Sequence, residues 1–373
     1  MRLSVDKEQF LKALSNAGRA IAPKSPLPLL ANFKIELNEK GLEVTGSNND
    51  ITIRTTVPYM IEGKAIITNP VPGGTLINAH LLEDIVRKME GSPISLDVID
   101  NAIAKVDDGH SSFKLNCANV DEYPDIDLEP SGTELTMGCQ QLEDLVAQSA
   151  FAASTKEQRP ILTALNLEAG DNALVAVATD SARLARKSVR IDSDVKFHAN
   201  VPARTLIDIT HLMEGCASVT FYVSDKKALF TFANTVVSSR LISGDYPVTR
   251  SIIPTAFNYF LQVNSQELVN AMDRVSVLSS GKESVVKLSM RDEKVEVSVR
   301  SDSNGSANEP LKTYQYTGES LDVSFNSLFV LDAIKALKSE DVTICFVAEM
   351  KPFVVKNPKD DSVIELITPM RTY

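Results

Sequence analysis

Residues Ile77–Gly91 read INAHLLEDIVRKMEG, and two other segments of the chain align with them over fifteen positions without a gap. They are Val201–Gly215, VPARTLIDITHLMEG, and Phe325–Ser339, FNSLFVLDAIKALKS. The copies begin at positions 77, 201 and 325, so each starts 124 residues after the previous one. Two equal intervals of this length indicate three autonomous domains rather than the short stacked units of a solenoid.

Each copy predicts a helix followed by a strand. The helices carry a largely apolar stripe at helical spacing. Its members are Leu81, Ile85 and Met89 in the first copy, Thr205, Ile209 and Met213 in the second, and Phe329, Ala333 and Leu337 in the third. The alternating segments that follow, 94–98, 219–223 and 342–347, predict strands.

A second helical pattern opens each third of the chain. Its i, i+4 pairs are Phe10 and Leu14, Leu142 and Val146, and Leu268 and Met272. Alternating segments at 42–45, 133–137, 174–177, 260–263 and 295–299 predict further strands. Each third should therefore have two helices and several strands, which is an α+β fold. Turn-forming residues cluster at 123–132 and 244–254, so we expect domains at 1–128, 129–253 and 254–373.

Composition limits the possible functions. The 373 residues carry a formal net charge of -11, which argues against wrapping nucleic acid with the whole surface but leaves room for one basic face. The N-terminal segment is charged, and no window approaches the roughly 18 to 20 apolar residues that a bilayer span needs. We therefore expect a soluble, cytoplasmic protein without a membrane partner.

The sequence offers no catalytic or metal-binding arrangement. Its four cysteines and four histidines lack the spacing of metal ligands or of a redox pair, so no metal, cofactor or catalytic residue is expected. A hydrolase that used Thr179, Asp180 or Ser181 would need a base within hydrogen-bond reach, and the sequence indicates none. A three-domain scaffold that oligomerises and binds protein without threading DNA is another possibility, which the lack of a basic inward face would favour.

Five short stretches, in their order and spacing, resemble the beta subunit of bacterial DNA polymerase III, the DNA sliding clamp, over the entire chain. They are KSPLPLL at 24–30, RPIL at 159–162, ATDSARLA at 178–185, DYP at 245–247 and PMR at 369–371. The resemblance implies three repeated DNA-clamp domains, each with two helices packed on antiparallel sheets. It also implies a head-to-tail homodimer that closes into a ring around double-stranded DNA, independently of sequence, and tethers the polymerase without catalysis.

The resemblance further implies a hydrophobic cleft for short linear motifs of the replicative polymerase subunit, the clamp loader and repair polymerases. Its residues would be Leu162, Thr179, Ser181, Arg183, Leu184, Pro247, Ile252, Leu366, Thr368, Pro369, Met370 and Arg371. Apolar side chains and a near-terminal methionine suit an adaptable surface, and Arg183 or Arg371 could hold a peptide's acidic or carbonyl groups. Plain domain packing is the alternative. The family commonly has Gly-His where this chain has Ser181-Ala182, so its peptide preference can differ.

Basic residues on or before the helices could face DNA, and the resemblance points to Lys24 and Arg204, with Arg87 and Lys156 as further candidates. Acidic residues share these helices, so an ordinary solvated helix face is the alternative. A weakly basic lining would suit sliding, because tight neutralisation of phosphates would hold a ring in place. The family often has aromatic residues directly after the position of Arg159, where this chain has Pro160-Ile161.

The ring interface is implied to pair Phe113 and Leu115 of the first domain with Val277 and Leu278 of the third. Burial of four such side chains at about 1.5 to 3 kcal/mol each would be a substantial part of the closing free energy, before the cost of association. Phe113 and Leu115 share one face of a predicted strand, and that face could instead belong to the domain core.

Overall fold

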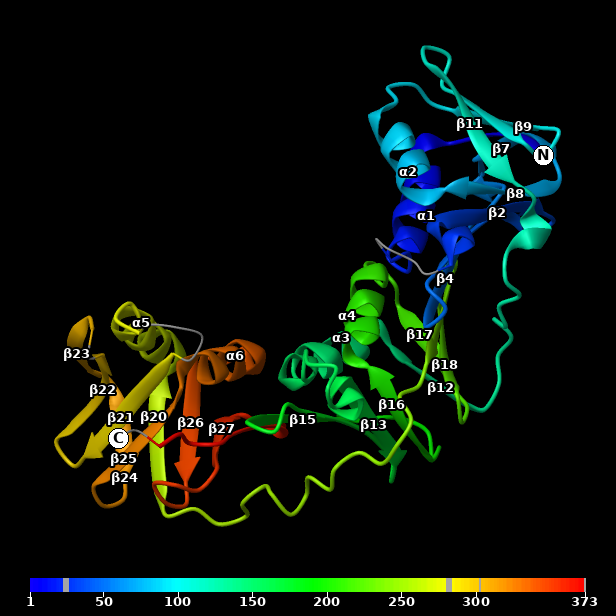
Figure 1. Cartoon of the computed structure of the whole chain (residues 1–373). Helices are drawn as coiled ribbons and strands as arrows, with labels where there is room; N and C mark the ends of the chain where they lie inside the picture. The colour runs from blue at the N-terminus through cyan, green and yellow to red at the C-terminus, as the bar shows by residue number, and fades with distance from the viewer. Residues whose placement is uncertain (23–26, 280–283, 302, 372–373) are drawn as a thin grey trace. The chain divides into compact units, whose positions relative to one another are not determined.

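The computed structural model describes residues 1–22, 27–279, 284–301 and 303–371 (Figure 1). Its internal contacts divide the chain into two compact units. Unit 1 comprises Met1–Cys139 and Asp208–Leu241, and unit 2 comprises Gln140–Ile207 and Ile242–Tyr373. No helix among the described residues is long and apolar enough to cross a membrane.

Both predicted series of helices are present. The repeated segments form α2 (Ala79–Lys88), α4 (Ala203–Leu212) and α6 (Ser327–Leu337), and the segments that open each third form α1 (Lys7–Gly18), α3 (Cys139–Ala147) and α5 (Ser265–Ser276). Side-chain caps begin several of them. Asn78 accepts a hydrogen bond from the N–H of Leu81, and Asn326 accepts one from the N–H of Leu328. These caps satisfy amide groups that the first helical turn leaves unpaired.

The predicted apolar stripe of α2 is wrong at one position. Leu81 is 49% exposed, whereas Ala79, Leu82 and Val86 are buried. Apolar residues occupy two adjacent i, i+4 rows of this helix, and the row that contains Leu82 and Val86 faces the core. Spacing alone could not choose between the two rows.

Unit 1 is built around one antiparallel sheet of thirteen strands. Its order is β12-β17-β18-β19-β4-β3-β2-β8-β11-β10-β9-β1-β7. The strand bounds are β1 (Arg2–Val5), β2 (Asn32–Asn38), β3 (Gly41–Ser47), β4 (Ile51–Val57), β7 (Ile67–Val71), β8 (Gly73–Asn78), β9 (Ile94–Ile99), β10 (Ile103–Asp107), β11 (Ser112–Ala118), β12 (Thr133–Gly138), β17 (Ser218–Val223), β18 (Lys227–Phe232) and β19 (Thr235–Arg240), with a separate hairpin of β5 (Met60–Ile61) and β6 (Lys64–Ala65).

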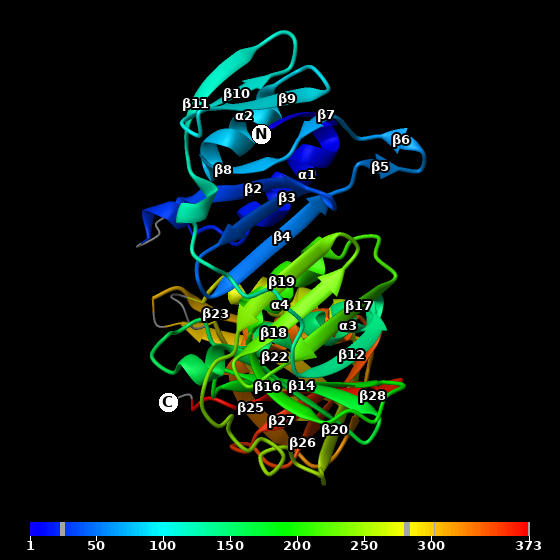
Figure 2. The same cartoon turned by 90° about the vertical axis from the view of Figure 1, so that its right-hand side faces the viewer.

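Strands from the first and second predicted domains meet inside this sheet. β4 pairs with β19 in antiparallel register (Figure 2). Across this pair, the hydroxyls of Thr55 and Thr235 lie 3.0 Å apart. On the helical side, Phe10 and Leu14 of α1 are fully buried against Phe33 and Ile35 of β2. The hydrophobic core of this part therefore lies between α1, α2 and the sheet.

Unit 2 contains a nine-stranded and a four-stranded antiparallel sheet. Their orders are β16-β13-β14-β15-β28-β27-β26-β20-β24 and β23-β22-β21-β25. The strand bounds are β13 (Ala164–Gly170), β14 (Ala173–Thr179), β15 (Arg183–Arg190), β16 (Phe197–Pro202), β20 (Tyr259–Asn264), β21 (Val285–Arg291), β22 (Lys294–Ser301), β23 (Gly305–Pro310), β24 (Tyr314–Thr317), β25 (Leu321–Asn326), β26 (Asp341–Phe346), β27 (Phe353–Asn357) and β28 (Asp360–Ile367).

The nine-stranded sheet joins the second and third predicted domains, because β15 pairs with β28 from Arg183↔Ile367 to Lys187↔Val363. Helices α5 and α6 pack against each other and cover the core of the third domain (Figure 1). Four short 3-10 helices complete the described elements: η1 (Pro28–Ala31), η2 (Val120–Glu122), η3 (Ala150–Ala152) and η4 (Pro160–Thr163).

Two connectors separate the predicted domains. Residues 123–132 and 241–258, all of them described, contain neither helix nor strand. They coincide with the turn-rich segments of the sequence. The exact domain bounds at 128 and 253 stay a prediction.

Candidate functional site

The turn between β14 and β15 is held by its own side chains. Asp180 Oδ1 accepts hydrogen bonds from the N–H groups of Ala182 at 2.9 Å and Arg183 at 3.0 Å. The hydroxyl of Thr179 donates to the carbonyl of Arg183 at 2.6 Å and accepts from the N–H of Ser181 at 3.1 Å. Ser181 has φ +78°, in the left-handed region that glycine adopts most readily.

Arg183 is the most connected side chain of this region. Its guanidinium donates to Asp180 at 3.1 Å, to Asp332 of α6 at 2.7 Å and to the carbonyl of Phe151 at 2.8 Å. It also lies over the rings of Phe151 and Phe329, 5.4 and 4.7 Å from their centroids. Arg183 therefore joins β15, η3 and α6, and these bonds occupy groups that the sequence analysis had offered to a peptide.

The C-terminal tail crosses beside this turn. The N–H of Thr368 donates to the carbonyl of Ala182 at 2.9 Å, and the N–H of Met370 donates to the carbonyl of Ser324 in β25 at 2.7 Å. Pro369 between them is buried, whereas Arg371 is exposed. The tail is thus fixed at two points, and Arg371 is the exposed arginine of the predicted cleft.

The turn, the tail and α6 enclose a pocket of about 470 Å³, which we call the inner pocket. Five predicted cleft residues line it: Ser181, Arg183, Thr368, Pro369 and Met370. The other lining residues are Ala153, Ser154, Thr155, Lys156, Asp180, Ala182, Asn326 and Phe329. Lys156, which the sequence analysis had offered to DNA, thus belongs to the wall of this pocket. Asn326 and Phe329 were not assigned to the cleft, although they are the cap and a stripe residue of the third repeated helix.

Two other apolar cleft residues, Leu184 of β15 and its partner Leu366 of β28, lie on the opposite face of the sheet from Arg183, since neighbouring residues of a strand point to opposite faces. We call the group that contains them the outer cluster. It comprises the buried Val177, Leu184, Val354 and Leu366, with Val175, Tyr246, Ile253, Phe257 and Ile364 packed against them. The hydroxyl of Tyr246 accepts a hydrogen bond from the N–H of Thr179 at 3.0 Å, which ties the second connector to the sheet. Pro247 and Ile252 of the same connector are exposed.

Leu162 is 5% exposed and belongs to neither group. Its carbonyl accepts a hydrogen bond from the N–H of Ser154 at 2.8 Å, so it supports the wall of the inner pocket from behind. Leu162 was expected in the cleft, but it supports the wall of the inner pocket and does not line it.

A buried carboxyl lies behind the inner pocket. Glu365 of β28 is 2% exposed, and within the described residues its Oε1 has no hydrogen-bond partner. Burial raises the pKa of Glu365 well above its ordinary value, and the charge of Arg183 opposes this only in part. Its burial could not be predicted from the sequence, because it depends on the pairing of β28 with both β15 and β27.

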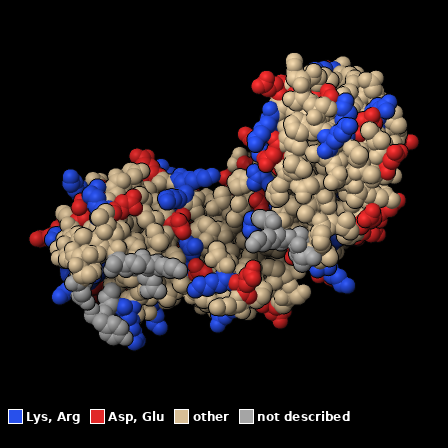
Figure 3. All heavy atoms as spheres, turned by 45° about the horizontal axis from the view of Figure 1, so that its top comes forward, with Lys and Arg blue, Asp and Glu red and all other residues tan. Residues whose placement is uncertain are grey.

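The expected DNA-facing residues differ in their surroundings. Arg87 forms ion pairs with Glu83 and Asp84 of its own helix, the latter at 3.2 Å. Arg204 is exposed near the start of α4, and Lys24 lies outside the described residues. On the face shown in Figure 3, basic and acidic side chains are interspersed. The charge of Arg87 is therefore neutralised within its own helix.

The expected interface residues differ in exposure. Val277 is 80% exposed at the end of α5, and Phe113 is 39% exposed in β11. Leu278 is partly buried against the core of the third domain. Leu115 is only 7% exposed and belongs to the core cluster of the first domain, so the shared face of Phe113 and Leu115 is buried at Leu115.

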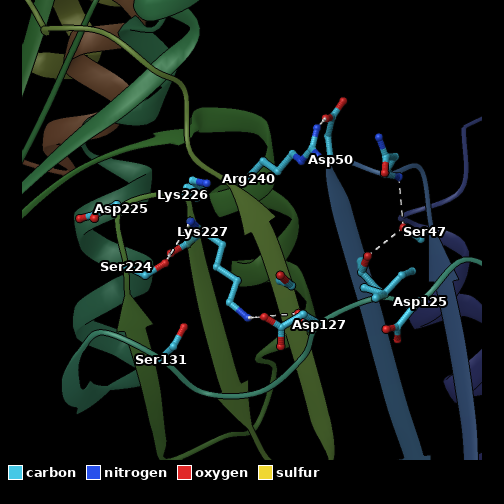
Figure 4. A pocket seen from close by; sticks show the side chains of 14 residues that line it. Ser47, Asp50, Asp125, Asp127, Ser131, Ser224, Asp225, Lys226, Lys227 and Arg240 are labelled. Atoms are coloured by element: carbon cyan, nitrogen blue, oxygen red, sulfur yellow. Dashed lines mark hydrogen bonds and ion pairs between the residues drawn. The ribbon is translucent and has the colours of Figure 1, made fainter.

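A second cavity, of about 560 Å³, lies in unit 1 under the first connector (Figure 4). Its wall includes Lys227 of β18, whose ammonium group donates to Asp127 Oδ2 at 2.6 Å and to the carbonyls of Asp127 and Glu129 at 3.2 and 3.0 Å. The Lys227 ammonium lowers the pKa of Asp127. These bonds fasten the connector to the sheet.

Thr179 and Asp180, which the hydrolase alternative would use, are already engaged within the turn. The hydroxyl proton of Thr179 is engaged by the carbonyl of Arg183, and Asp180 is engaged by backbone N–H groups. Within the described parts of the chain, no group of three or more His, Cys, Asp or Glu could hold a metal ion.

Comparison with known families accounts for the repeat. Residues 1–127, 136–248 and 250–371 match the N-terminal, central and C-terminal domains of the DNA polymerase III beta subunit. The chain belongs to the DNA polymerase III beta subunit family. The members of this family are sliding clamps, processivity factors of the polymerase rather than its catalytic subunit. The hydrolase alternative is thereby excluded.

Relatives cover the chain from end to end. The chain is 31% identical to the beta sliding clamp of Bacillus subtilis (strain 168) over 378 residues and 32% identical to that of Staphylococcus aureus (strain Mu50) over 377, with 100% of each chain covered. Crystal structures of the clamps of Bacillus subtilis and Streptococcus pneumoniae superpose over 100% of each chain with TM-scores of 0.96 and 0.95, at 30% and 32% identity. The clamp of Bartonella birtlesii, crystallised with griselimycin, has a TM-score of 0.92 at 28% identity, again with full coverage.

Proposed function

We propose that two copies of this chain close head-to-tail into a ring around double-stranded DNA and tether the replicative polymerase to it in the cytoplasm. The single observation that carries this proposal is the threefold repeat, which matches three clamp domains in order along the whole chain. Two chains would contribute six domains, and their repeated helices would face the enclosed duplex. Function then follows from closure and not from a reactive side chain.

Open strand edges support closure. β11 pairs with β10 along Ser112–Asn116 but meets β8 only at Cys117 and Ala118, so one edge of Ser112–Asn116 has no partner strand within the described chain. β23 likewise pairs only with β22. Antiparallel pairing of β11 with β23 of a second copy would satisfy both edges and remove a risk of uncontrolled association.

The expected interface side chains lie at these edges. Phe113 is in the open part of β11. The carbonyl of Leu278 accepts a hydrogen bond from Asn304, directly before β23, at 3.3 Å, and α5 packs against β23. Exposed Phe113 and Val277 would therefore be buried when the strands pair, while Leu115 would stay in its own core.

The balance of charge suits sliding. Arg87 is paired with acidic residues of its own helix, so few fixed phosphate contacts would form there. We keep Lys24, Arg87 and Arg204 as candidate DNA-facing residues and assign Lys156 to the inner pocket. A ring held by topology needs little phosphate neutralisation, because the duplex cannot leave without an end or an opening.

The inner pocket and the outer cluster together form the proposed cleft for partner peptides of the polymerase, the clamp loader and repair polymerases. The cleft offers apolar side chains for anchors, and Met370 can adapt to different partners. The rigid turn at 179–183 separates the two regions and would position a peptide that spans both.

The test uses the tail. Deletion of Met370 to Tyr373 removes part of the inner pocket but none of the proposed interface. We expect the deletion variant to remain a dimer in analytical ultracentrifugation, yet to lose its stimulation of primer extension by the cognate polymerase and loader. Full stimulation by the variant would refute the assignment of the cleft, and a monomeric variant would show that the tail belongs to the interface.

A further inference from the structure

An arginine lies within the outer cluster. Arg186 follows Leu184 by two residues in β15, so both side chains point to the same face. Its cross-strand neighbours are Val177 of β14 and Ile364 of β28, both members of the outer cluster. Residues opposite each other in antiparallel strands share a face. The Arg186 guanidinium therefore emerges among the apolar side chains of the proposed cleft.

Arg186 has no counterion in contact. The side chain is partly buried, and among the described residues it forms neither a hydrogen bond nor an ion pair. Burial and the nearby charge of Arg250 lower the pKa of Arg186, whereas Glu168 acts in the opposite direction. A half-buried charge without a partner is unfavourable, so an anion would be stabilised here.

Glu168, a carboxylate near these arginines, is weakly held. Arg250 Nη2 lies 3.7 Å from Glu168 Oε2, and the two side chains are 79% and 54% exposed. An exposed pair at this distance contributes little. Two guanidinium groups thus share one loosely placed carboxylate, and the local charge remains positive.

Exposed apolar residues flank Arg250 in the second connector. Val248 is 78% exposed and Ile252 is 48% exposed. A ligand that fits this surface combines apolar groups with a negative charge. An acidic peptide has this combination, and guanidinium groups match the geometry of a carboxylate.

We propose that Arg186 and Arg250 form a carboxylate-binding site at the outer cluster, which selects partner peptides that carry Asp or Glu beside their apolar anchors. This inference rests on the proposed peptide cleft and adds the charge of the ligand to it. Apolar anchors would supply most of the affinity, and the two arginines would decide between partners.

The first test is selection from a random-peptide phage library on the full-length protein and on the Arg186→Gln/Arg250→Gln variant. We expect both proteins to enrich peptides with apolar anchors, and only the unmodified protein to enrich an acidic residue beside them. Equal enrichment of acidic residues on both proteins, or none on the unmodified protein, would overturn the inference. Failure of both to select apolar anchors would instead refute the proposed cleft.

The second test measures one selected peptide and its Asp→Asn or Glu→Gln twin by fluorescence anisotropy. We expect the unmodified protein to bind the acidic peptide about tenfold more tightly than its neutral twin, since a charge-assisted, partly buried pair has this strength. The Arg186→Gln variant should bind the two peptides equally. Arg190→Gln is the matched control, because it removes an exposed arginine from the same strand and should keep the tenfold preference.

Two further arms remove ambiguity. Amidation of the peptide C-terminus should leave the preference for the acidic peptide unchanged. If amidation abolished this preference, the ligand of the two arginines would be the terminal carboxylate and not an acidic side chain. Arg186→Lys keeps the charge without the forked geometry, so it should retain part of the preference for the acidic peptide. It replaces Arg186→Gln in the test if that variant unfolds. A folded Arg186→Lys variant and a folded Arg250→Gln variant that both keep the full preference would contradict the site.

Discussion

Arg183 and Leu184 are neighbours in the chain but belong to different parts of the cleft. Arg183 is bound to Asp180, Asp332 and the Phe151 carbonyl on one face of β15, and Leu184 packs in the outer cluster on the other. At the residue scale, one strand therefore serves both the inner pocket and the outer cluster. The hydrogen bonds of the turn at 179–183 hold the start of this strand in place.

Ser181 holds a conformation that its side chain disfavours. A non-glycine residue at φ +78° costs on the order of 1 kcal/mol or more. We expect Ser181→Gly to raise the free energy of unfolding by about 1 kcal/mol in urea denaturation. Ser188→Gly, in the regular part of β15, is the control and should lower it by about 0.5 to 1 kcal/mol. Equal destabilisation by both changes would contradict this account.

Glu365 predicts an unusual dependence of stability on pH. Its pKa is raised in the folded protein, so the carboxyl stays protonated there after it ionises in the unfolded chain. Stability is therefore lost as the pH rises from the ordinary pKa of 4.5 toward the raised folded pKa. We expect Glu365→Gln to be more stable than the unmodified protein at pH 7 and nearly equal to it at pH 4, in thermal unfolding. An equal difference at both pH values would show that ionisation plays no part.

At the scale of elements, sequence periodicity predicted the six helices, because this signal is local. The strand pairings β4 with β19 and β15 with β28 could not be predicted, since register between distant strands depends on tertiary contacts. For the same reason, the sequence analysis assigned Leu184 and Leu366 to the cleft but could not predict that they pack together in the outer cluster. Arg186 was missed entirely, because only its cross-strand neighbours reveal its surroundings.

Lys227 anchors the first connector by hydrogen bonds. Lys227 donates to three oxygen atoms of Asp127 and Glu129 from a side chain that is 17% exposed. We expect Lys227→Met to speed amide hydrogen exchange of residues 123–132 by about fivefold, which corresponds to a loss of about 1 kcal/mol. The exposed neighbour Lys226 supplies the control, because Lys226→Met should leave this exchange unchanged. Equal exchange rates of residues 123–132 in the two variants would show that the hydrogen bonds of Lys227 do not hold the connector.

At the scale of the whole molecule, the proposed function depends on closure of the ring. Val277 and Val248 are a matched pair of exposed valines, at 80% and 78%, and only Val277 lies at the proposed interface. We expect Val277→Asp to weaken dimerisation at least tenfold, about 1.4 kcal/mol, in sedimentation equilibrium, and Val248→Asp to have no effect on it. Dissociation by Val248→Asp alone would place the interface elsewhere.

Retention on DNA of different topology tests the central claim most directly. The protein is loaded on a nicked circular plasmid, separated from free protein by gel filtration, and the plasmid is then cut once with a restriction enzyme. A closed ring that holds DNA by topology should stay on the circle and leave once ends appear, at the same salt concentration. Equal retention on the circular and the linear plasmid would mean that the protein binds DNA by contact, and would contradict the clamp mechanism proposed for this chain.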